Sequence, residues 1–323
     1  MRKIFIPLIL VFSVLSINIQ VFGQGKSKPK IGPKPSAAVI NISGSATMYP
    51  LMVRWANEYM KINPTIRINV LNTGSNKGLF NIKSNAFDFG MLSRELSNKE
   101  KKSGFQATPV AKDALVVFMN NKNPYVKSVR SHGFTYRELI EMFVTQTLDT
   151  WYHLNTNAQK IKIDLSLPSD NSGNAAVFAS YLHTLPEIMI GKRYNTDAAI
   201  LDAVKKNVYA IGYASSSVVY DTKTRSVKSD FLILPTDYDD DGLIDENENN
   251  YSSLDFLINA INVNMIPSPP ARNLYLVKRG NSSKEAAAFL NWILTYGQHY
   301  TGKLGFAPAN TVSIKDNKTD SRF

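Results

Sequence analysis

Residues 39–59, VINISGSATMYPLMVRWANEY, contain the pattern that decides the fold. Residues 39–42 are a short apolar run, which predicts a buried strand. A small polar turn, Gly44-Ser45-Ala46-Thr47, follows this run. Apolar residues then recur at helical spacing and predict a helix that Asn63-Pro64 ends. The apolar residues of this helix are Met48, Leu51, Met52, Trp55, Ala56 and Tyr59.

The same order of strand, turn and helix recurs along the first half of the chain. Residues 66–70 alternate as a strand, residues 74–78 form a Gly-bearing turn, and residues 79–84 continue as a short helix. Two more strands are predicted at 87–91 and 114–119, and Ser97 and Glu100 form a capping box for a short helix. This repetition predicts an α/β fold with a parallel or mixed sheet.

The second half contains the same elements after a crossing point at residues 120–124. We expect two α/β lobes with mixed sheets and a ligand cleft between them. Lobe I would combine residues 37–116 with 271–323, and lobe II would span residues 117–270. Strands are predicted at 161–165, 209–213, 231–234 and 274–277, and helices at 135–144, 174–182, 197–204, 254–261 and 284–296.

The composition excludes several classes of protein. Of the 323 residues, 44% are hydrophobic and 20% are charged, which is typical of a globular chain and not of a disordered one. The absence of cysteine excludes disulfides, zinc-thiolate sites and a cysteine nucleophile. The four histidines lack metal-ligand spacing, and no nucleophile elbow, Walker loop or dinucleotide fingerprint is present. We therefore expect no enzyme activity and no catalytic cofactor.

The N-terminus has the pattern of a cleaved secretory signal peptide at residues 1–23. Arg2 and Lys3 precede an apolar run at 4–15, and small residues precede the expected cut. Residues 24–36 follow as a flexible, basic, proline-containing leader. The net charge of +11 becomes +9 without the two signal charges and +5 without the four leader lysines. We therefore expect a periplasmic protein without a lipid anchor, membrane span or nucleic-acid partner.

Three of the predicted helices begin with small hydroxyl residues and glycine. The junctions are 44–47, 74–78 and Ser172-Gly173-Asn174. The first N–H groups of a helix lack intrahelical partners and the helix dipole is positive there, so such ends bind anions. Ser93-Arg94 follows the strand at 87–91, and an arginine there offers a bidentate fork. Together these residues predict a site for a tetrahedral oxyanion, although each junction alone is also an ordinary helix cap.

An ordered set of motifs resembles the phosphate-binding protein of phosphate ABC transporters, which has a type 2 periplasmic-binding-protein fold. The resemblance implies a monomer that captures phosphate for the membrane subunits of a transporter. It also implies anion contacts from Ser45, Thr47, the Met48 amide, Ser75, Ser93, Arg94, Ser172, Gly173 and Asn174. The motifs are GSATMYPL at 44–51, TGSNKG at 73–78, DFGMLSREL at 88–96, Ser172-Gly173 with FASYL at 178–182, AIGY at 210–213 and RNLYLV at 272–277.

The sequence departs from that family at three positions. No arginine precedes Ser172, since residues 167–170 read Leu-Pro-Ser-Asp. Asn174 replaces the threonine that is usual in the Ser-Gly turn. Ser93 stands where well-studied members have an aspartate that accepts a proton from the ligand and favours phosphate over sulfate. Arg94 is the residue that would restore the missing positive charge.

Residues 237–248, DYDDDGLIDENE, match the twelve-residue calcium loop of EF-hand proteins. Carboxylates occupy positions 1, 3, 5, 9 and 12, and glycine occupies position 6, where the chain turns sharply. The flanking segments are not a paired EF-hand, so we expect one structural Ca²⁺. Without a cation the loop would be an acidic solvated hairpin. The predicted ligands are Asp237, Asp239, Asp241, the Leu243 carbonyl, Asp245 and Glu248.

Two alternatives to phosphate transport remain open at this point. The chain could be a calcium-stabilised secreted interaction protein that reuses the fold without transport. It could also bind sulfate or a molybdate-type oxyanion. Convergence within reach of one anion favours either anion-binding function, and its failure favours the interaction protein; the residues that must converge are Thr47, Ser75, Arg94 and Ser172.

Overall fold

The computed structural model describes residues 38–154, 159–246, 248–267 and 270–309. These residues belong to one compact unit. The predicted signal peptide at 1–23 and the leader at 24–36 lie outside the described residues. Within them, no helix combines the length and apolar character needed to cross a membrane.

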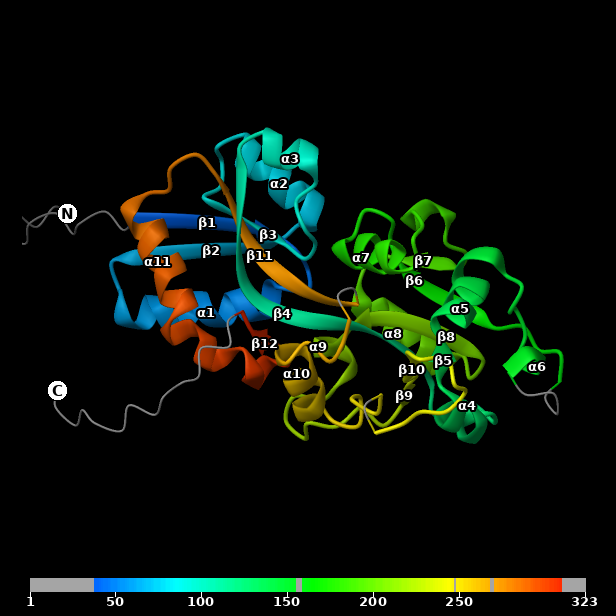
Figure 1. The fold of residues 1–323 in the computed structure, drawn as a ribbon. Coiled ribbons are helices and arrows are strands. Elements are labelled where there is room, and N and C mark those ends of the chain that lie inside the picture. Colours follow the sequence, from blue (N-terminus) through cyan, green and yellow to red (C-terminus); the bar gives the residue numbers. More distant parts are fainter. Residues whose placement is uncertain (1–37, 155–158, 247, 268–269, 310–323) are drawn as a thin grey trace, which may run out of the picture. The chain divides into compact units, whose positions relative to one another are not determined.

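A ten-stranded mixed sheet forms the centre of the fold (Figure 1). Its strand order is β2-β1-β3-β11-β4-β8-β6-β7, and β9 and β12 both pair with β4. A separate two-stranded sheet pairs β5 (Phe134–Thr135) with β10 (Thr236–Asp237). The ten strands are β1 (Ala38–Gly44), β2 (Ile66–Asn72), β3 (Phe89–Leu92), β4 (Phe105–Asn120), β6 (Asp164–Pro168), β7 (Lys192–Tyr194), β8 (Ala210–Ser215), β9 (Phe231–Ile233), β11 (Ala271–Arg279) and β12 (Ala307–Pro308).

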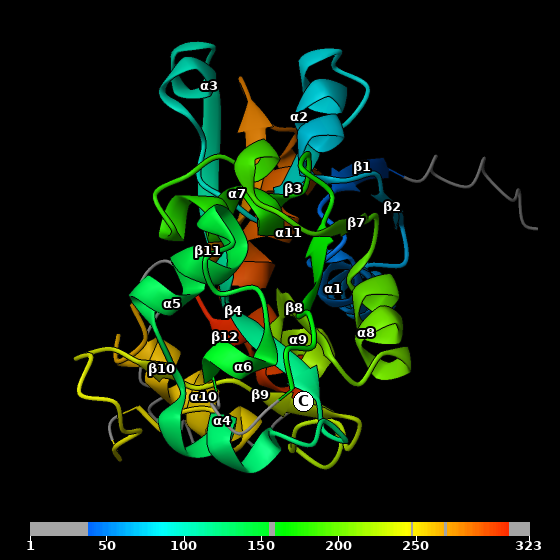
Figure 2. The ribbon, with the colours of Figure 1, turned by 90° about the vertical axis from the view of Figure 1, so that its right-hand side faces the viewer.

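The long strand β4 joins the two halves of this sheet (Figure 1 and Figure 2). Its first part pairs with β11 in antiparallel register, and residues Leu115 to Met119 pair with β8. Within each half the other strands run partly parallel: β1 pairs in parallel with β2 and β3, and β6 with β7 and β8. The predicted mixed α/β fold is therefore confirmed, while the exact boundaries of the two lobes stay a prediction.

Helices follow most of the strands, as the sequence pattern predicts. The expected capping box at Ser97 is present, because Ser97 accepts from the Glu100 amide, and Thr135 forms a second one by accepting from the Glu138 amide. The helices are α1 (Tyr49–Ile62), α2 (Ser75–Lys83), α3 (Asn98–Lys102), α4 (Val126–His132), α5 (Tyr136–Ile140), α6 (Trp151–Leu154), α7 (Gly173–Tyr181), α8 (Asp197–Lys206), α9 (Ser216–Val219), α10 (Leu254–Asn262) and α11 (Lys284–Leu294).

Some predicted elements differ from the observed ones, and some observed elements were not predicted. The helix expected at 135–144 ends as α-helix at Ile140 and continues as a π-helical turn, η1 (Glu141–Thr145). The strand expected at 161–165 lies at 164–168 instead, where it pairs with both β7 and β8. Helix α4 was not predicted; only Val129 of its seven residues is buried, so it has almost no apolar periodicity.

The apolar faces predicted for the helices form the core. Helix α1 buries Leu51, Met52, Trp55, Ala56 and Tyr59 against β1, β3, β11 and α11. The Trp55 indole N–H donates to the Gly297 carbonyl at 2.7 Å, which satisfies its polar group inside the core. A second cluster packs Phe178 of α7 on Tyr213 of β8, with ring centroids 4.0 Å apart. These clusters fix the strand ends and helix starts that carry the polar turns.

Candidate anion-binding site

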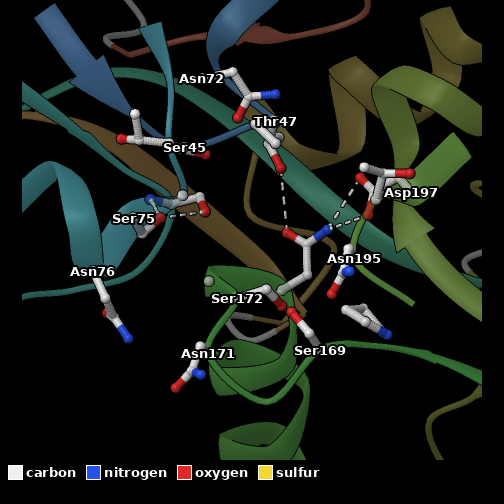
Figure 3. A pocket seen from close by; sticks show the side chains of 18 of the residues that line it. Ser45, Thr47, Asn72, Ser75, Asn76, Ser169, Asn171, Ser172, Asn195 and Asp197 are labelled. Carbon is white, nitrogen blue, oxygen red and sulfur yellow. Dashed lines mark hydrogen bonds between the residues drawn. The ribbon is translucent and has the colours of Figure 1, made fainter. Parts of the chain in front are cut away.

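A cavity of about 730 Å³ lies where four helix N-termini meet (Figure 3). Its wall combines residues of both halves of the sheet. The turns before α1 and α2 and the end of β3 come from one half, and the turns before α7 and α8 from the other. The lining residues are Ser45, Ala46, Thr47, Asn72, Thr73, Gly74, Ser75, Asn76, Lys77, Ser93, Pro168, Ser169, Asn171, Ser172, Gly173, Asn174, Tyr194, Asn195, Thr196 and Asp197.

The helix N-termini differ in whether a side chain accepts a hydrogen bond from one of their first backbone amides. Ser172 caps α7 by accepting from the Ala175 amide at 3.0 Å, and Thr196 caps α8 by accepting from Ala199 at 3.2 Å. Gly74 at the start of α2 has no side chain and gives no such cap. The first amides of α2 therefore keep donor capacity at the cavity wall, and the positive end of the helix dipole adds to it.

One part of the wall is closely packed. There the residue after β3 contacts the first residues of α2 and α7. The Ser75 and Ser93 hydroxyl oxygens are 3.3 Å apart. A Cβ placed on Gly173 would lie 2.2 Å from the Ser93 hydroxyl and 3.2 Å from that of Ser75. Glycine is therefore required at position 173 for this close approach. The start of α7 at Gly173, about 80 to 100 residues further along the chain, thus lies directly against the hydroxyl groups of Ser93 and Ser75.

Asn174 connects the two halves of the cavity wall through its side-chain amide. Its side-chain oxygen accepts from the Thr47 hydroxyl at 3.3 Å and from Nη2 of Arg272 at 2.7 Å. Its side-chain nitrogen donates to the two Asp197 oxygens at 2.8 and 3.1 Å. Because Arg272 can only donate, these contacts fix the orientation of the amide.

Arg272 lies behind the wall and is buried. Its guanidinium pairs with Asp113, with contacts of 2.7 and 3.0 Å, and Nη1 donates to the Ser93 carbonyl at 3.0 Å. Asp113 is itself buried and accepts from the Ser215 hydroxyl at 2.6 Å. A buried arginine with this set of acceptors holds the β3 end and Asn174 in place.

Asp197 is the acidic residue of the wall. Burial of its carboxyl group raises the pKa of Asp197 to about 6, and the Arg272 charge and the Asn174 hydrogen bonds offset part of that effect. Lys77 and Asp197 are the charged residues of the lining, so its formal charges cancel. Attraction for an anion therefore depends on backbone amides and hydroxyl groups. Thr73 adds one more donor: its hydroxyl is buried and has no hydrogen-bond partner within the described residues.

Seven of the nine predicted anion contacts lie on the cavity wall, and two do not. The residues on the wall are Ser45, Thr47, Ser75, Ser93, Ser172, Gly173 and Asn174. Met48 has a buried side chain in the core, and its amide donates to the Ser45 hydroxyl at 3.4 Å. Arg94, the predicted replacement cation, lies outside the lining. Its guanidinium pairs with Glu100 at 2.8 and 2.9 Å and donates to Asn76 at 2.9 Å, outside the lining.

Sequence reasoning missed the Asp197 carboxylate and the arginine behind the wall. Asn195-Thr196-Asp197 has the same small polar composition as the three junctions that were identified, and that signal was available. Arg272 lies two residues before the strand predicted at 274–277, and nothing in the sequence indicates its partner Asp113. Its role depends on β11 and β4 being neighbours, with Arg272 opposite Asp113 in the register.

The predicted calcium loop brings three carboxylates together. One ligand oxygen from each of Asp237, Asp239 and Glu248 lies within 4.8 Å of the others. Asp237 and Glu248 are buried, at 1% and 5% exposure, although buried carboxylates need compensation. Backbone amides provide some of it, since Asp237 accepts from the amides of Asp240 and Gly242 at 2.7 and 2.8 Å. Gly242 has φ of +83°, a backbone conformation that favours glycine.

The other predicted calcium ligands of the loop lie outside this cluster of three carboxylates. Asp241 accepts from the Leu243 amide at 2.8 Å, and Asp245 accepts from the Glu248 amide at 3.0 Å. Neither carboxylate belongs to the cluster of three. Leu243, whose carbonyl was the sixth predicted ligand, is exposed at 64%. Three of the five predicted carboxylates therefore lie close together, and the other two accept hydrogen bonds from backbone amides of the loop.

Some known proteins are similar to this chain over a short segment, and others over most of its length. The chain is 32% identical over 90 residues to "Phosphate-binding protein PstS 2" of Streptococcus agalactiae, covering 28% of this chain and 31% of that protein. The streptococcal relatives are thus matched over about a third of their length. "Phosphate-binding protein PstS" of Pseudomonas aeruginosa is 27% identical over 304 residues, covering 85% of each chain.

Solved structures support the fold. A putative phosphate ABC transporter substrate-binding protein with bound phosphate from Clostridium perfringens superposes with a TM-score of 0.67 at 21% identity, covering 84% of this chain and 99% of that one. An ABC-type phosphate transport receptor from Vibrio cholerae gives a TM-score of 0.62 at 18% identity, covering 83% and 99%. The expected two-lobed type 2 periplasmic-binding-protein fold is confirmed.

A family model described as "PBP superfamily domain" matches residues 32–296. This match includes all four helix starts of the cavity wall and the loop at 237–248. From the fold, the cavity and this match, we conclude that the chain belongs to the PBP superfamily domain family.

Proposed function

We propose that the protein is a non-catalytic solute-binding protein that holds one phosphate ion in the cavity at the four helix N-termini. The observation that carries this proposal is the meeting of Ser75, Ser93 and Gly173 beside the uncapped start of α2. A tetrahedral oxyanion has acceptors in several directions, which suits donors that arrive from separate segments. The printed names of the relatives, phosphate-binding proteins, support phosphate among the oxyanions.

The composition of the wall also supports binding without catalysis. It contains no histidine or cysteine, and its two charged residues come from different helices, α2 and α8. Hydroxyl groups and amides of this kind bind an anion by hydrogen bonds and leave its bonds intact. We expect the bound ion to be released unchanged.

Titration calorimetry on the mature chain with phosphate tests the proposal, and Ser172→Ala is the informative variant. Removing one hydrogen bond to a charged ligand costs about 1.5–3 kcal/mol, so we expect about 10- to 150-fold weaker binding. Ser283→Ala is the matched control. Ser283 caps α11 through the Ala286 amide at 3.1 Å, as Ser172 caps α7, but it does not line the cavity. Equal affinities for the two variants would contradict the proposal.

The same titrations separate the alternatives. A binder of sulfate or molybdate would prefer those anions to phosphate at neutral pH. A calcium-stabilised interaction protein would bind none of the three anions, and the Ser172 and Ser283 variants would then be indistinguishable. Three of the four residues whose convergence separates these alternatives, Thr47, Ser75 and Ser172, line one cavity, and Arg94 does not. The three that converge support anion binding over the interaction protein.

We further propose export and delivery to a transporter. Cleavage of the signal peptide after Gly23 would release a monomeric periplasmic protein that passes phosphate to the membrane subunits of an ABC transporter. Mass spectrometry of the exported chain should find Gln24 at the N-terminus. Retention of residues 1–23 would contradict the processing, and phosphate uptake unaffected by deletion of the gene would contradict delivery.

The loop at 237–248 is proposed to hold one structural Ca²⁺. The carboxylates of Asp237, Asp239 and Glu248 supply hard oxygen ligands, which Ca²⁺ prefers. Binding would bring Asp241 and Asp245 out of their turn contacts. This ion would stabilise the fold and would not take part in anion binding.

A further inference from the structure

The Asn174 side chain lies between the buried Arg272 guanidinium and the cavity. Asn174 belongs to the cavity lining, whereas Arg272 does not. Both residues are buried, and Nη2 of Arg272 donates to the Asn174 side-chain oxygen at 2.7 Å. The Thr47 hydroxyl, which also lines the cavity, donates to the same oxygen at 3.3 Å. One neutral amide oxygen therefore accepts from two donors that belong to different segments of the chain.

An oxygen of a bound anion would suit the same position. A guanidinium donates a stronger hydrogen bond to a charged oxygen than to a neutral one, so the amide makes weaker use of Arg272 than an anion would. The Asn174 side chain offers an anion little in exchange. Its nitrogen, which carries all the donors of the side chain, donates to the two Asp197 oxygens at 2.8 and 3.1 Å. The amide therefore acts toward the cavity as an acceptor that competes with an anion.

The other contacts of Arg272 show that its guanidinium does not depend on Asn174 for its position. Nε and Nη2 both donate to Asp113, at 2.7 and 3.0 Å, and Nη1 donates to the Ser93 carbonyl at 3.0 Å. Each Nη atom carries two N–H groups, so Nη2 can donate to Asp113 and Asn174 together. Removal of the amide therefore frees one N–H beside the Thr47 hydroxyl, while Asp113 and Ser93 continue to hold the guanidinium.

We propose that Asn174 determines the anion affinity of this cavity, because its amide oxygen occupies the position in which an anion oxygen would accept from Thr47 and Arg272. The inference rests on the proposed function. The formal charges of the lining cancel, and Arg272 is a cation that lies one side chain behind it. With asparagine at position 174, the cavity binds an anion through hydroxyl groups and backbone amides. With a shorter side chain, the anion would also bind an arginine.

Titration calorimetry with phosphate on wild type, Asn174→Ala and Asn174→Thr tests the inference. Both variants remove the amide oxygen, and threonine keeps a polar side chain in case the alanine variant does not fold. One additional hydrogen bond to a charged ligand should lower the phosphate dissociation constant about 10-fold or more. Asn120→Ala is the matched control and should keep the wild-type affinity. Asn120 is an equally buried asparagine that donates to two backbone carbonyls at 2.9 Å, and it does not line the cavity.

A crystal structure of either Asn174 variant with arsenate gives a second readout, which a change in stability alone would not produce. We expect one oxygen of the anion within hydrogen-bonding distance of both Nη2 of Arg272 and the Thr47 hydroxyl. In wild type the Asn174 oxygen should remain in that position when arsenate is bound. The comparison therefore identifies the donor that accounts for the gain in affinity.

Each outcome decides the inference. Wild type that binds phosphate at least as tightly as the variants overturns it and leaves the proposed function intact, because Asn174 would then be an anion contact or a structural residue. Failure of both variants to fold, or tighter binding without an anion oxygen at Arg272, also overturns it. If a variant binds phosphate and wild type does not, the inference holds and the proposed function fails. If none of the three proteins binds phosphate, both fail.

Discussion

The cavity wall and the loop at 237–248 contain almost opposite sets of polar groups. The wall has 20 residues with one lysine and one aspartate, so donors for an anion come from amides and hydroxyl groups. The loop has seven acidic residues in the twelve positions 237–248, and three of their carboxylates lie close together. A candidate cation loop can be recognised in the sequence by its charged side chains. An anion site built from helix N-termini can be recognised only in the tertiary structure, where those N-termini lie close together.

The largest expected effect concerns the ion pair behind the wall. Arg272→Met leaves Asp113 buried and unpaired and should lower the free energy of unfolding by about 3–5 kcal/mol. Lys206→Met breaks the exposed pair with Asp202, which is worth less than about 1 kcal/mol. Urea denaturation of both variants measures the difference. Similar losses for the two would mean that the wall does not depend on the buried arginine.

Calcium should stabilise the fold through the loop alone. At a free concentration about 100 times the dissociation constant, Ca²⁺ adds about 2.7 kcal/mol to the unfolding free energy, seen as a higher Tm. Asp237→Asn should abolish this gain. Asp240→Asn is the control within the same loop, because position 4 supplies no predicted ligand, and it should respond like wild type. A chelator without effect on wild-type Tm would contradict the calcium proposal.

A methyl group at position 173 tests whether the close contact of Gly173 with Ser75 and Ser93 is needed for anion binding. Gly173→Ala places a Cβ against the Ser93 and Ser75 hydroxyls, and the resulting displacement should weaken phosphate binding about 10- to 100-fold. At Gly302 a Cβ meets nothing within 4 Å, so Gly302→Ala should leave affinity unchanged. Calorimetry compares the two. Unaltered affinity of the Gly173 variant would show that the ion binds elsewhere.

Titration of the Asp197 carboxyl group should change the free energy of unfolding with pH in the absence of any ligand. Its pKa is raised from 3.8 to about 6, so ionisation disfavours the folded state. The contribution of this group to stability is complete below pH 3.8 and is lost as pH increases through about 6. Asp197→Asn should therefore gain about 1–2 kcal/mol relative to wild type between about pH 4 and pH 7. A difference that stays constant over this range would contradict the raised pKa.

The smallest expected effect is that of Arg94→Ala. The sequence alone predicts more than about tenfold weaker phosphate binding, because a charge-assisted hydrogen bond is worth about 1.5–3 kcal/mol. In the structure this guanidinium is held by Glu100, whose pKa it lowers, and it is absent from the cavity lining. We therefore expect less than about a threefold change in the phosphate dissociation constant. A loss above tenfold would restore Arg94 to the site.

The fold could be predicted because its signals are local. Apolar periodicity located most strands and helices, and the two capping boxes at Ser97 and Thr135 are present. The π-helical turn after Ile140 and the shifted strand β6 were missed, since both depend on packing and pairing partners that are distant in sequence. Helix α4 was missed because it has almost no buried face.

From the sequence, only features that depend on the backbone could be placed on the cavity wall. Glycine and hydroxyl residues at helix starts indicate where donors lie, so Ser75, Ser172 and Gly173 could be identified as candidates. Side-chain partners could not be predicted in the same way. Arg94 has Glu100 six residues away, while Arg272 finds Asp113 across 159 residues through strand register. Long side chains reach many positions, and only tertiary structure selects one.

The most direct test of the central claim is a crystal structure grown with arsenate, a tetrahedral oxyanion whose arsenic atom gives an anomalous signal. We predict one arsenic peak within hydrogen-bonding reach of Ser75, Ser93 and the start of α7 at Gly173. A peak on another surface, or an empty cavity at saturating arsenate, would contradict the account.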